Sequence, residues 1–287
     1  MALTLFLNIV LLFTIKSNRI LQTLDNAFIV NLSVCDLMNG LAGIGNLILW
    51  NMPSLNKEMF RDLCLGVMIL VNYVVMSEFA ALFIFTVDRF LKITYPFKHD
   101  IICTNLRFIF LIVFIHSVSA LATFCFSLTF EWDVTKECNY FNVFPQSVVI
   151  FVNTCIFISL SSMLVMNMKI LFTSKRQARQ INVQLVSVRP TGNSNPEPEV
   201  KSVHVGKILG VLSLFTFVAF VPYWVYLGIQ LAGVKLSDYT QILLHNMGLY
   251  LWLMGPILNP LAFMMGKSDI NACARQMLLK NCTRTRT

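Results

Sequence analysis

The stretch "CLGVMILVNYVVMSEFAALFIFTVDRF", residues 64–90, decides the fold class of this chain. Residues 64–86 form an apolar run with one acidic side chain, Glu78, and the run ends just before the adjacent charges Asp88 and Arg89. A helix needs about 20 mostly apolar residues to cross a bilayer core of roughly 30 Å. We therefore interpret residues 64–86 as a membrane-spanning helix with an acid-base pair at its end.

The rest of the chain has the same character. Of its 287 residues, 56% are hydrophobic and 13% are charged, and the mean hydropathy is +0.70. Soluble domains lie far from these values. The sequence predicts a single all-α domain, a bundle of seven transmembrane helices, with a cytoplasmic loop at 173–205 and a cytoplasmic tail at 266–287. The predicted spans are residues 1–15, 27–50, 64–86, 106–130, 146–172, 206–233 and 239–265.

The first run is short because its apolar part begins at Met1. We expect the outer half of this helix and any extracellular tail to be missing. A cleaved signal peptide has an apolar core of similar length and is the competing interpretation. Lys16 and Arg19 follow the run and no small-residue cleavage site does, which argues against a signal peptide.

Lysine and arginine side chains indicate the orientation, because they collect on the cytoplasmic side of membrane proteins. With the carboxyl terminus inside, all but four of the 22 lysines and arginines lie on that side. We expect a multi-pass plasma-membrane protein with its amino terminus outside. The formal charge of +8 then reflects topology and attraction to anionic membrane lipid, and no nucleic-acid partner is expected.

The cysteines also sort by compartment. Of the eight, Cys64 and Cys138 fall near the outer surface, where oxidation is permitted. We expect a disulfide between them, with two unrelated buried thiols as the alternative. Cys273 and Cys282 lie just inside the membrane, where they are candidates for palmitoylation or remain free thiols.

An amphipathic pattern follows the last span. Ile270, Ala274, Met277 and Leu278 recur at helical spacing, opposite charged residues of the same stretch. This pattern predicts a short helix that lies on the inner membrane surface.

Five short motifs stand in order on the predicted spans. They are Asn8, Asp36 in "NLSVCD", Cys64 at 25 residues before Arg89, "FVPYW" in the sixth span and "NPLAF" in the seventh. Together they resemble the motifs of rhodopsin-like, or class A, G protein-coupled receptors over essentially the whole chain. The phrases "KRQARQI" and "DRFLKITYPFK" resemble the amine and trace-amine-associated branch of that family.

The resemblance implies a heterotrimeric G protein as partner. In the family, the arginine at Arg89 is held by the aspartate at Asp88 in the inactive state and then meets the G protein. Pro96 and Phe97 match a loop pair whose apolar side chain enters a pocket of the G protein. Further switch positions, two of which lack the family's tyrosine, are Asn167, Asn259, Pro260 and Phe263.

The resemblance also implies a pocket for a small extracellular ligand among the third, fifth, sixth and seventh helices. Val71 stands where the amine branch has an aspartate, so an amine would lack its usual counterion. A mostly apolar wall favours a neutral or lipid-like ligand, although an aromatic cage could hold an amine. Ordinary packing is the alternative role for each lining residue. The implied lining residues are Val71, Asn72, Val75, Phe151, Cys155, Phe220, Tyr223, Trp224, Leu227, Leu249 and Leu253.

Ionisable side chains within membrane spans are costly and usually functional. Asp36 and Glu78 qualify, and the family alignment places them face to face at mid-depth. Two carboxylates in a low-dielectric site cannot easily both ionise, so either one keeps a proton or a cation lies between them. We hypothesise a sodium- or proton-sensitive site of Asp36, Glu78 and Asn259. The alternative is a static clasp in which a protonated Glu78 is hydrogen-bonded to Asp36.

The four histidines, His99, His116, His204 and His245, lie in different segments and give no zinc spacing. We expect no metal site among them, and we expect His116 to be a hydrogen-bonded packing residue. No Ser-His-Asp set or glycine-rich phosphate loop is visible, so the chain is not expected to be an enzyme or to need a cofactor beyond a sodium ion.

Two alternative functions stay open. An ion- or proton-coupled seven-helix transporter could use Asp36 and Glu78 as its ion path, although the missing inverted repeats argue against it. A receptor relative that no longer signals is the second alternative, because several family motifs are altered.

Overall fold

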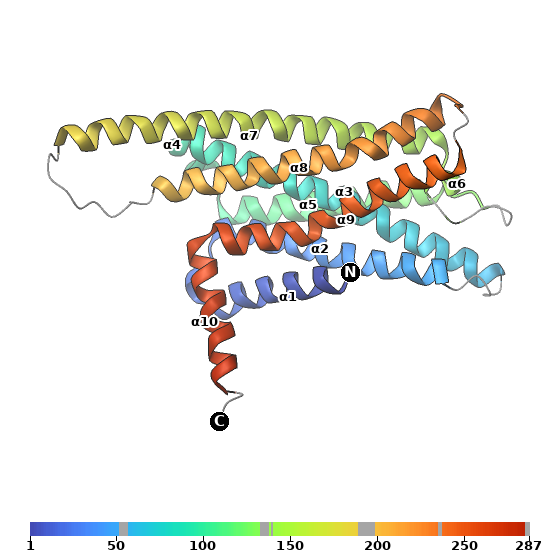
Figure 1. Ribbon diagram of the computed structural model, residues 1–287, viewed down its shortest axis with the longest axis horizontal. Coiled ribbons are helices and arrows are strands. Elements are labelled where there is room, and N and C mark those ends of the chain that lie inside the picture. Colours follow the sequence, from blue (N-terminus) through green and yellow to red (C-terminus); the bar gives the residue numbers. More distant parts are fainter. Residues whose placement is uncertain (52–56, 133–137, 139, 189–198, 235–236, 285–287) are drawn as a thin grey trace. The chain divides into compact units, whose positions relative to one another are not determined.

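The structure is a computed structural model that describes residues 1–51, 57–132, 138, 140–188, 199–234 and 237–284. Within these ranges every regular element is a helix (Figure 1). The elements are α1 (Ala2–Ser17), η1 (Arg19–Leu21), α2 (Leu24–Asn51), α3 (Lys57–Thr94), α4 (Pro96–Ile102), α5 (Asn105–Ser127), α6 (Tyr140–Val143), α7 (Gln146–Val188), α8 (Glu199–Leu231), α9 (Asp238–Gly266) and α10 (Ser268–Arg284).

Six helices of the described residues are long and apolar enough to cross a membrane, namely α2, α3, α5, α7, α8 and α9. The 16-residue α1 is apolar but shorter than the roughly 20 residues that a span needs. With α1 in first place, the helices follow the order of the seven predicted runs. The predicted all-α membrane fold is confirmed, and the protein is a multi-pass membrane protein.

Local sequence explains where helices begin and end. Pro96 occupies the first turn of α4, where its missing N–H is not needed. The Ser237 side chain caps α9 by accepting a hydrogen bond from the Thr240 N–H at 3.3 Å. Gly233 follows α8 with a φ of 65°, a conformation that favours glycine.

Several helices extend beyond the apolar runs that predicted them, and α3 and α7 extend furthest. α3 begins at Lys57 and ends at Thr94, although its apolar run covers 64–86. α7 continues to Val188, past the predicted membrane boundary at residue 172. The added ends are polar but contain no glycine or proline, so nothing in them stops the helix.

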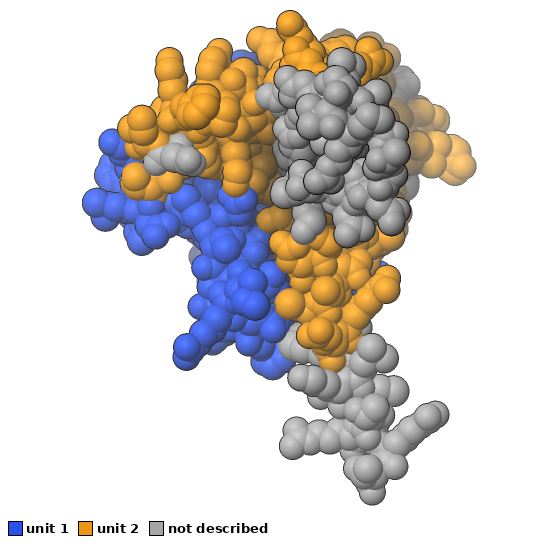
Figure 2. All heavy atoms as spheres, turned by 90° about the vertical axis from the view of Figure 1, so that its left-hand side faces the viewer, with its two compact units in different colours: residues 1–82, 105–159 blue, residues 83–104, 160–287 orange. Residues whose placement is uncertain are grey.

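The chain forms two compact units, which Figure 2 colours separately. Unit 1 contains residues 1–82 and 105–159, and unit 2 contains residues 83–104 and 160–287. In unit 1, α2 packs against α1 and α5; in unit 2, α9 packs against α8 and α10. The prediction of a single domain stays a prediction, and each unit is described by itself.

In unit 1, Cys64 of α3 forms a disulfide with Cys138, which confirms the predicted pair. The two residues are separated by 74 positions, and their Cα atoms lie 6.0 Å apart. Nearby, the ring of Phe60 on α3 packs against Trp132 at a centroid distance of 5.8 Å. The bridge therefore fastens the segment that precedes α7 to the start of α3.

In unit 2, α8 and α9 approach closely at Gly248. A Cβ atom at this position would lie 2.9 Å from the Cβ of Tyr223 and 3.3 Å from its backbone N and Cα. The approach therefore requires glycine. Three prolines lie inside these helices, Pro222 in α8 and Pro256 and Pro260 in α9.

The helix predicted after the last span is present as α10. Ile270 and Ala274 are buried on its apolar side, whereas Asp269 and Arg275 are exposed. Its position on the inner membrane surface stays a prediction.

Candidate functional site

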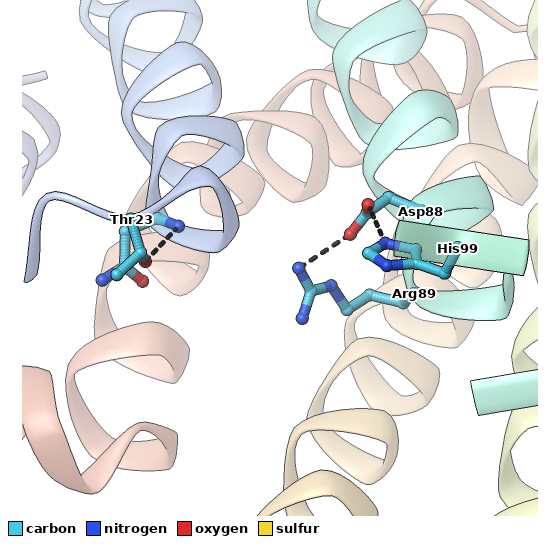
Figure 3. Close-up of polar contacts among 5 residues, drawn as sticks. Thr23, Asp88, Arg89 and His99 are labelled. Atoms are coloured by element: carbon cyan, nitrogen blue, oxygen red, sulfur yellow. Dashed lines mark hydrogen bonds and ion pairs between the residues drawn. The ribbon is translucent and has the colours of Figure 1, made fainter. Parts of the chain in front are cut away.

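The acid-base pair near the end of α3 belongs to a buried cluster of three side chains in unit 2. Arg89 Nη2 lies 2.7 Å from Asp88 Oδ2, and His99 Nε2 lies 2.9 Å from Asp88 Oδ1 (Figure 3). Exposed fractions are 3% for Asp88 and 6% for both partners. His99 reaches the pair because the chain turns at Tyr95 and then continues as α4. The carboxylate of Asp88 is therefore held on both oxygens.

Arg89 has a second contact on its own helix. Its Cζ lies 5.3 Å from the ring centroid of Phe85, an attractive cation–π arrangement. Phe85 in turn packs edge-to-face on Phe263 of α9, at a centroid distance of 5.7 Å. The predicted switch residues Arg89 and Phe263 thus belong to one packed group.

A hydrogen bond joins α7 to α8 in the same unit. Asn167 Nδ2 donates to Ser213 Oγ at 2.8 Å, and both residues are buried. Ser213 Oγ also donates to the backbone oxygen of Gly210 at 3.2 Å. Asn167 replaces the family's tyrosine with a group that links the fifth and sixth spans directly.

Burial of the ion pair between Asp88 and Arg89 makes the pair costly to separate. Removing one partner from a buried ion pair costs about 3–5 kcal/mol, because the other charge is left without compensation. Arg89 can leave Asp88 at low cost only if another group takes its charge. The arrangement therefore has the properties of a latch whose release needs a new partner for Arg89.

Next to the latch, α4 presents an exposed aromatic side chain. Phe97 is 92% exposed, and the preceding Pro96 is also exposed. An exposed phenylalanine in a connecting segment is suited to insertion into an apolar pocket of a partner. The remaining switch positions Asn259 and Pro260 are buried in α9.

The two intramembrane carboxyl groups lie in unit 1. Asp36 of α2 is fully buried and Glu78 of α3 is 5% exposed. Glu78 Oε2 accepts a hydrogen bond from Asn39 Nδ2 at 2.8 Å, a partner that the sequence interpretation did not name. Asn39 lies three residues after Asp36, so both occupy one face of α2. Asn259, the third residue of the predicted ion site, belongs to unit 2.

A partly buried polar group of unit 1 links three helices. His116 of α5 contacts the Tyr73 hydroxyl of α3 through Nδ1 at 2.8 Å and Asn31 Oδ1 of α2 through Nε2 at 3.0 Å. These contacts confirm that His116 is a hydrogen-bonded packing residue.

Of the predicted ligand-pocket residues of unit 1, Asn72 is the most deeply buried. It is 2% exposed, its Nδ2 donates to the Met68 backbone oxygen at 3.1 Å, and its Oδ1 accepts from the Tyr140 hydroxyl at 3.1 Å. Val71, Val75 and Cys155 are partly buried.

Phe151 differs from the other pocket residues of unit 1. Its side chain is 55% exposed, and its ring packs against Phe126 of α5 at a centroid distance of 6.1 Å. It thus contributes to the α5 face of α7, and its role in a ligand pocket stays a prediction.

Four of the predicted pocket residues of unit 2 recur at helical spacing on α8. The Phe220 ring lies 5.7 Å from that of Trp224 and 6.3 Å from that of Tyr223, and Leu227 continues the same face. Leu253 of α9 is partly buried. The side chain of Leu249 lies outside the described residues, as does that of the lipidation candidate Cys282, whereas Cys273 is partly buried.

The family described as "7 transmembrane receptor (rhodopsin family)" matches residues 7–263, which include parts of all seven spans. The chain belongs to this family. The histamine H1 receptor of Bos taurus is 31% identical over 96 residues, which is 33% of the chain and 19% of that receptor. The chain therefore matches about a fifth of the length of this curated relative.

Membership in the rhodopsin family confirms the resemblance inferred from the motifs. Since the family consists of receptors, the prediction that this chain is not an enzyme is also confirmed. The similarity to a receptor named for histamine agrees with the leaning toward the amine branch.

In this rhodopsin-family receptor, the sequence indicated several functional residues but not the residues that form hydrogen bonds with them. His99, Asn39, Ser213 and Tyr140 each bind a predicted residue from another element. The spacing of Asn39 from Asp36 was a usable signal. All four contacts join different elements, and no spacing along one element reveals the partners His99, Ser213 and Tyr140.

Proposed function

We propose that this chain is a plasma-membrane receptor that binds a small extracellular ligand and activates a heterotrimeric G protein. Its amino terminus faces outward and its carboxyl terminus faces the cytoplasm. The observation that carries the proposal is the buried pair of Asp88 and Arg89 beside the exposed Phe97. A switch that a bound partner releases requires an ion pair that can be broken and, next to it, a side chain that can bind the partner.

Activation is a shift between two populations. In the closed state Arg89 is bound to Asp88 and lies over Phe85, and the bond from Asn167 to Ser213 ties α8 to α7. In the open state α8 moves away from α7 and Arg89 contacts the G protein instead. A ligand drives this change only as far as it binds the open state more tightly, and about 5.5 kcal/mol is needed to move a 1:99 population to 99:1.

The proposed cytoplasmic end of α7 supplies a contact for membrane lipid. Lys175, Arg176 and Arg179 are close together there, beside Phe172, and line a surface groove. Basic side chains near an anionic leaflet gain about 1 kcal/mol each. They support the proposed orientation and help to position this end of the receptor at the inner leaflet.

The ligand is proposed to be neutral or lipid-like, with an amine as the alternative. Val71 offers no counterion, and the adjacent polar group is the neutral pair of Asn72 and Tyr140. The similarity to the histamine H1 receptor favours the amine. A thermal-shift screen of neutral and amine ligands separates the two, and Val71→Asp should add stabilisation by amines only if position 71 lies in the pocket.

We propose a sodium site at Asp36 and Glu78. Both are buried carboxylates, and hard cations prefer oxygen ligands, so the donor set suits this ion. Sodium at a hundred times its dissociation constant would stabilise the fold by about 2.7 kcal/mol. Replacing sodium by a bulky organic cation should lower the melting temperature of the parent but not of Glu78→Gln. Asn46→Ala, which loses a bond to its own helix, is the matched control and should keep the response.

Isolation of a receptor–G protein complex tests the function. The chain in lipid nanodiscs is incubated with purified heterotrimers, nucleotide is removed enzymatically, and retained heterotrimer is measured. We expect retention of at least one heterotrimer, reversed by a non-hydrolysable GTP analogue. Retention no greater than on empty nanodiscs would contradict the proposal and favour a relative that no longer signals. Ion flux in proteoliposomes without G protein would favour the transporter, against which the family match argues.

A further inference from the structure

Three side chains of types that bind metal ions come together near the end of α3. The function proposed above does not require a metal ion there. His99 and Cys103 lie one helical turn apart, since the Cys103 N–H donates to the His99 backbone oxygen at 2.7 Å. Asp88 approaches from α3, with Oδ1 at 2.9 Å from His99 Nε2. One ligand atom from each of the three residues lies within 4.8 Å of the other two. Among the described residues, no other group of three or more histidine, cysteine, aspartate or glutamate side chains brings its ligand atoms this close together.

We propose that Asp88, His99 and Cys103 form a binding site for a zinc-class divalent metal ion. Zinc binds carboxylate oxygen, imidazole nitrogen and thiolate sulfur at about 2.0–2.3 Å. Ligand atoms around one such ion therefore lie roughly 3–4 Å apart. The three atoms lie within 4.8 Å of one another, so small side-chain movements bring them to an ion. The fourth tetrahedral position is left to water.

The donor set selects the class of metal. Magnesium and calcium prefer oxygen ligands alone, whereas a thiolate and an imidazole favour zinc and its neighbours in the transition series. His99 lies in the last turn of α4 and Cys103 is its C-cap residue four positions later, so both side chains stand at the same end of this helix. The spacing of the histidines alone does not reveal this group, because His99 is joined by an aspartate and a cysteine.

The burial of the group matches a small ion that enters from the loop. Asp88 and His99 are buried, Cys103 is partly buried, and Ile102 and Thr104 on either side of the cysteine are exposed. In the proposed orientation the cytoplasm keeps Cys103 reduced and able to bind metal as a thiolate. Asp88 binds Arg89 through Oδ2, and an ion bound by Oδ1 and His99 takes the place of the hydrogen bond that now joins Oδ1 to His99 Nε2.

Occupancy has a consequence for the latch, and that consequence rests on the proposed function. A divalent ion on Oδ1 neutralises Asp88 and repels the nearby guanidinium, so it weakens the attraction that holds Arg89. Metal binding should then raise basal nucleotide exchange. Binding itself is a property of three side chains and can be measured without a G protein.

The test uses Co²⁺ as a spectroscopic probe on the purified, reduced full chain in lipid nanodiscs. We expect a thiolate-to-cobalt charge-transfer band that saturates at one ion per chain and is displaced by Zn²⁺. Cys103→Ser should lose the band, and His99→Gln should weaken binding at least about tenfold. Glutamine can still donate a hydrogen bond to Asp88, so this variant removes the metal ligand while keeping the structural contact.

A cysteine elsewhere in the chain supplies the control. Cys125 is exposed on α5, and Cys125→Ser should keep both the band and the affinity. A band that persists in Cys103→Ser, affinity unchanged in His99→Gln, or no band in the parent would overturn the proposal. Binding without any rise in exchange would leave the metal site in place and contradict only its link to the proposed function.

Discussion

The bond between Asn167 and Ser213 allows a quantitative test of the closed state. The two side chains join α7 to α8 over 2.8 Å, with exposed fractions of 2% and 9%. A buried hydrogen bond between neutral groups contributes about 0.5–1.5 kcal/mol, which changes an equilibrium constant by a factor of about 2 to 13. If about 1% of the chains are open, Asn167→Ala raises that fraction to between about 2% and about 11%.

Ser213→Ala should have an effect at least as large, because it leaves the buried amide of Asn167 without this acceptor. In Asn167→Ala, by contrast, Ser213 keeps its bond to Gly210. The assay is the basal rate of nucleotide exchange on a heterotrimer, measured at equal receptor concentration. The double variant should exceed neither single variant by much, since both remove the same bond.

Thr216 supplies the matched control for this experiment. Its hydroxyl donates to the Leu212 backbone oxygen within α8, so Thr216→Ala removes a hydroxyl without separating α7 from α8. Basal exchange that stays at the parent rate in Asn167→Ala and Ser213→Ala, or that rises equally in Thr216→Ala, would refute the reasoning.

Two further predictions concern packing and docking. Gly248→Val should destabilise the fold by about 1–3 kcal/mol through overpacking against Tyr223, seen as a lower melting temperature. Gly255→Ala, whose added Cβ meets no described atom within 4 Å, is the control, and equal losses would contradict the contact. Phe97→Ala should weaken G protein binding by about 2 kcal/mol, roughly 30-fold, without changing the melting temperature. Phe110→Ala, an exposed phenylalanine on α5, should leave binding unchanged, and a similar loss there would exclude a specific role for Phe97.

The sequence predicted the features that depend on local composition. Apolar runs give the spans because a helix must satisfy its own backbone in lipid, and the length of the run is therefore decisive. The compartment rule for thiols gave Cys64 and Cys138, and the structure joins them. The adjacent charges of Asp88 and Arg89 could be read directly, and they do form an ion pair.

Contacts between helices could not be predicted in the same way, because they depend on how each helix is rotated about its axis. His99 reaches Asp88 only because the short α4 turns the chain back after α3, and a seven-residue helix gives no clear periodic signal. The contacts of Ser213 and Tyr140 could not be predicted either, because they also depend on how the helices are rotated about their axes. The pairing of Cys103 with His99 was readable from their spacing, but a search restricted to histidines passed over it.

The central claim is that Arg89 transmits the open state to a G protein. The most direct measurement is guanine-nucleotide exchange by a panel of purified heterotrimers on the chain in lipid nanodiscs, with Arg89→Ala measured in parallel. We expect at least one heterotrimer to exchange nucleotide faster than on empty nanodiscs, and we expect Arg89→Ala to abolish this acceleration. Equal exchange on the parent and on Arg89→Ala, or no acceleration by any heterotrimer, would contradict the central claim.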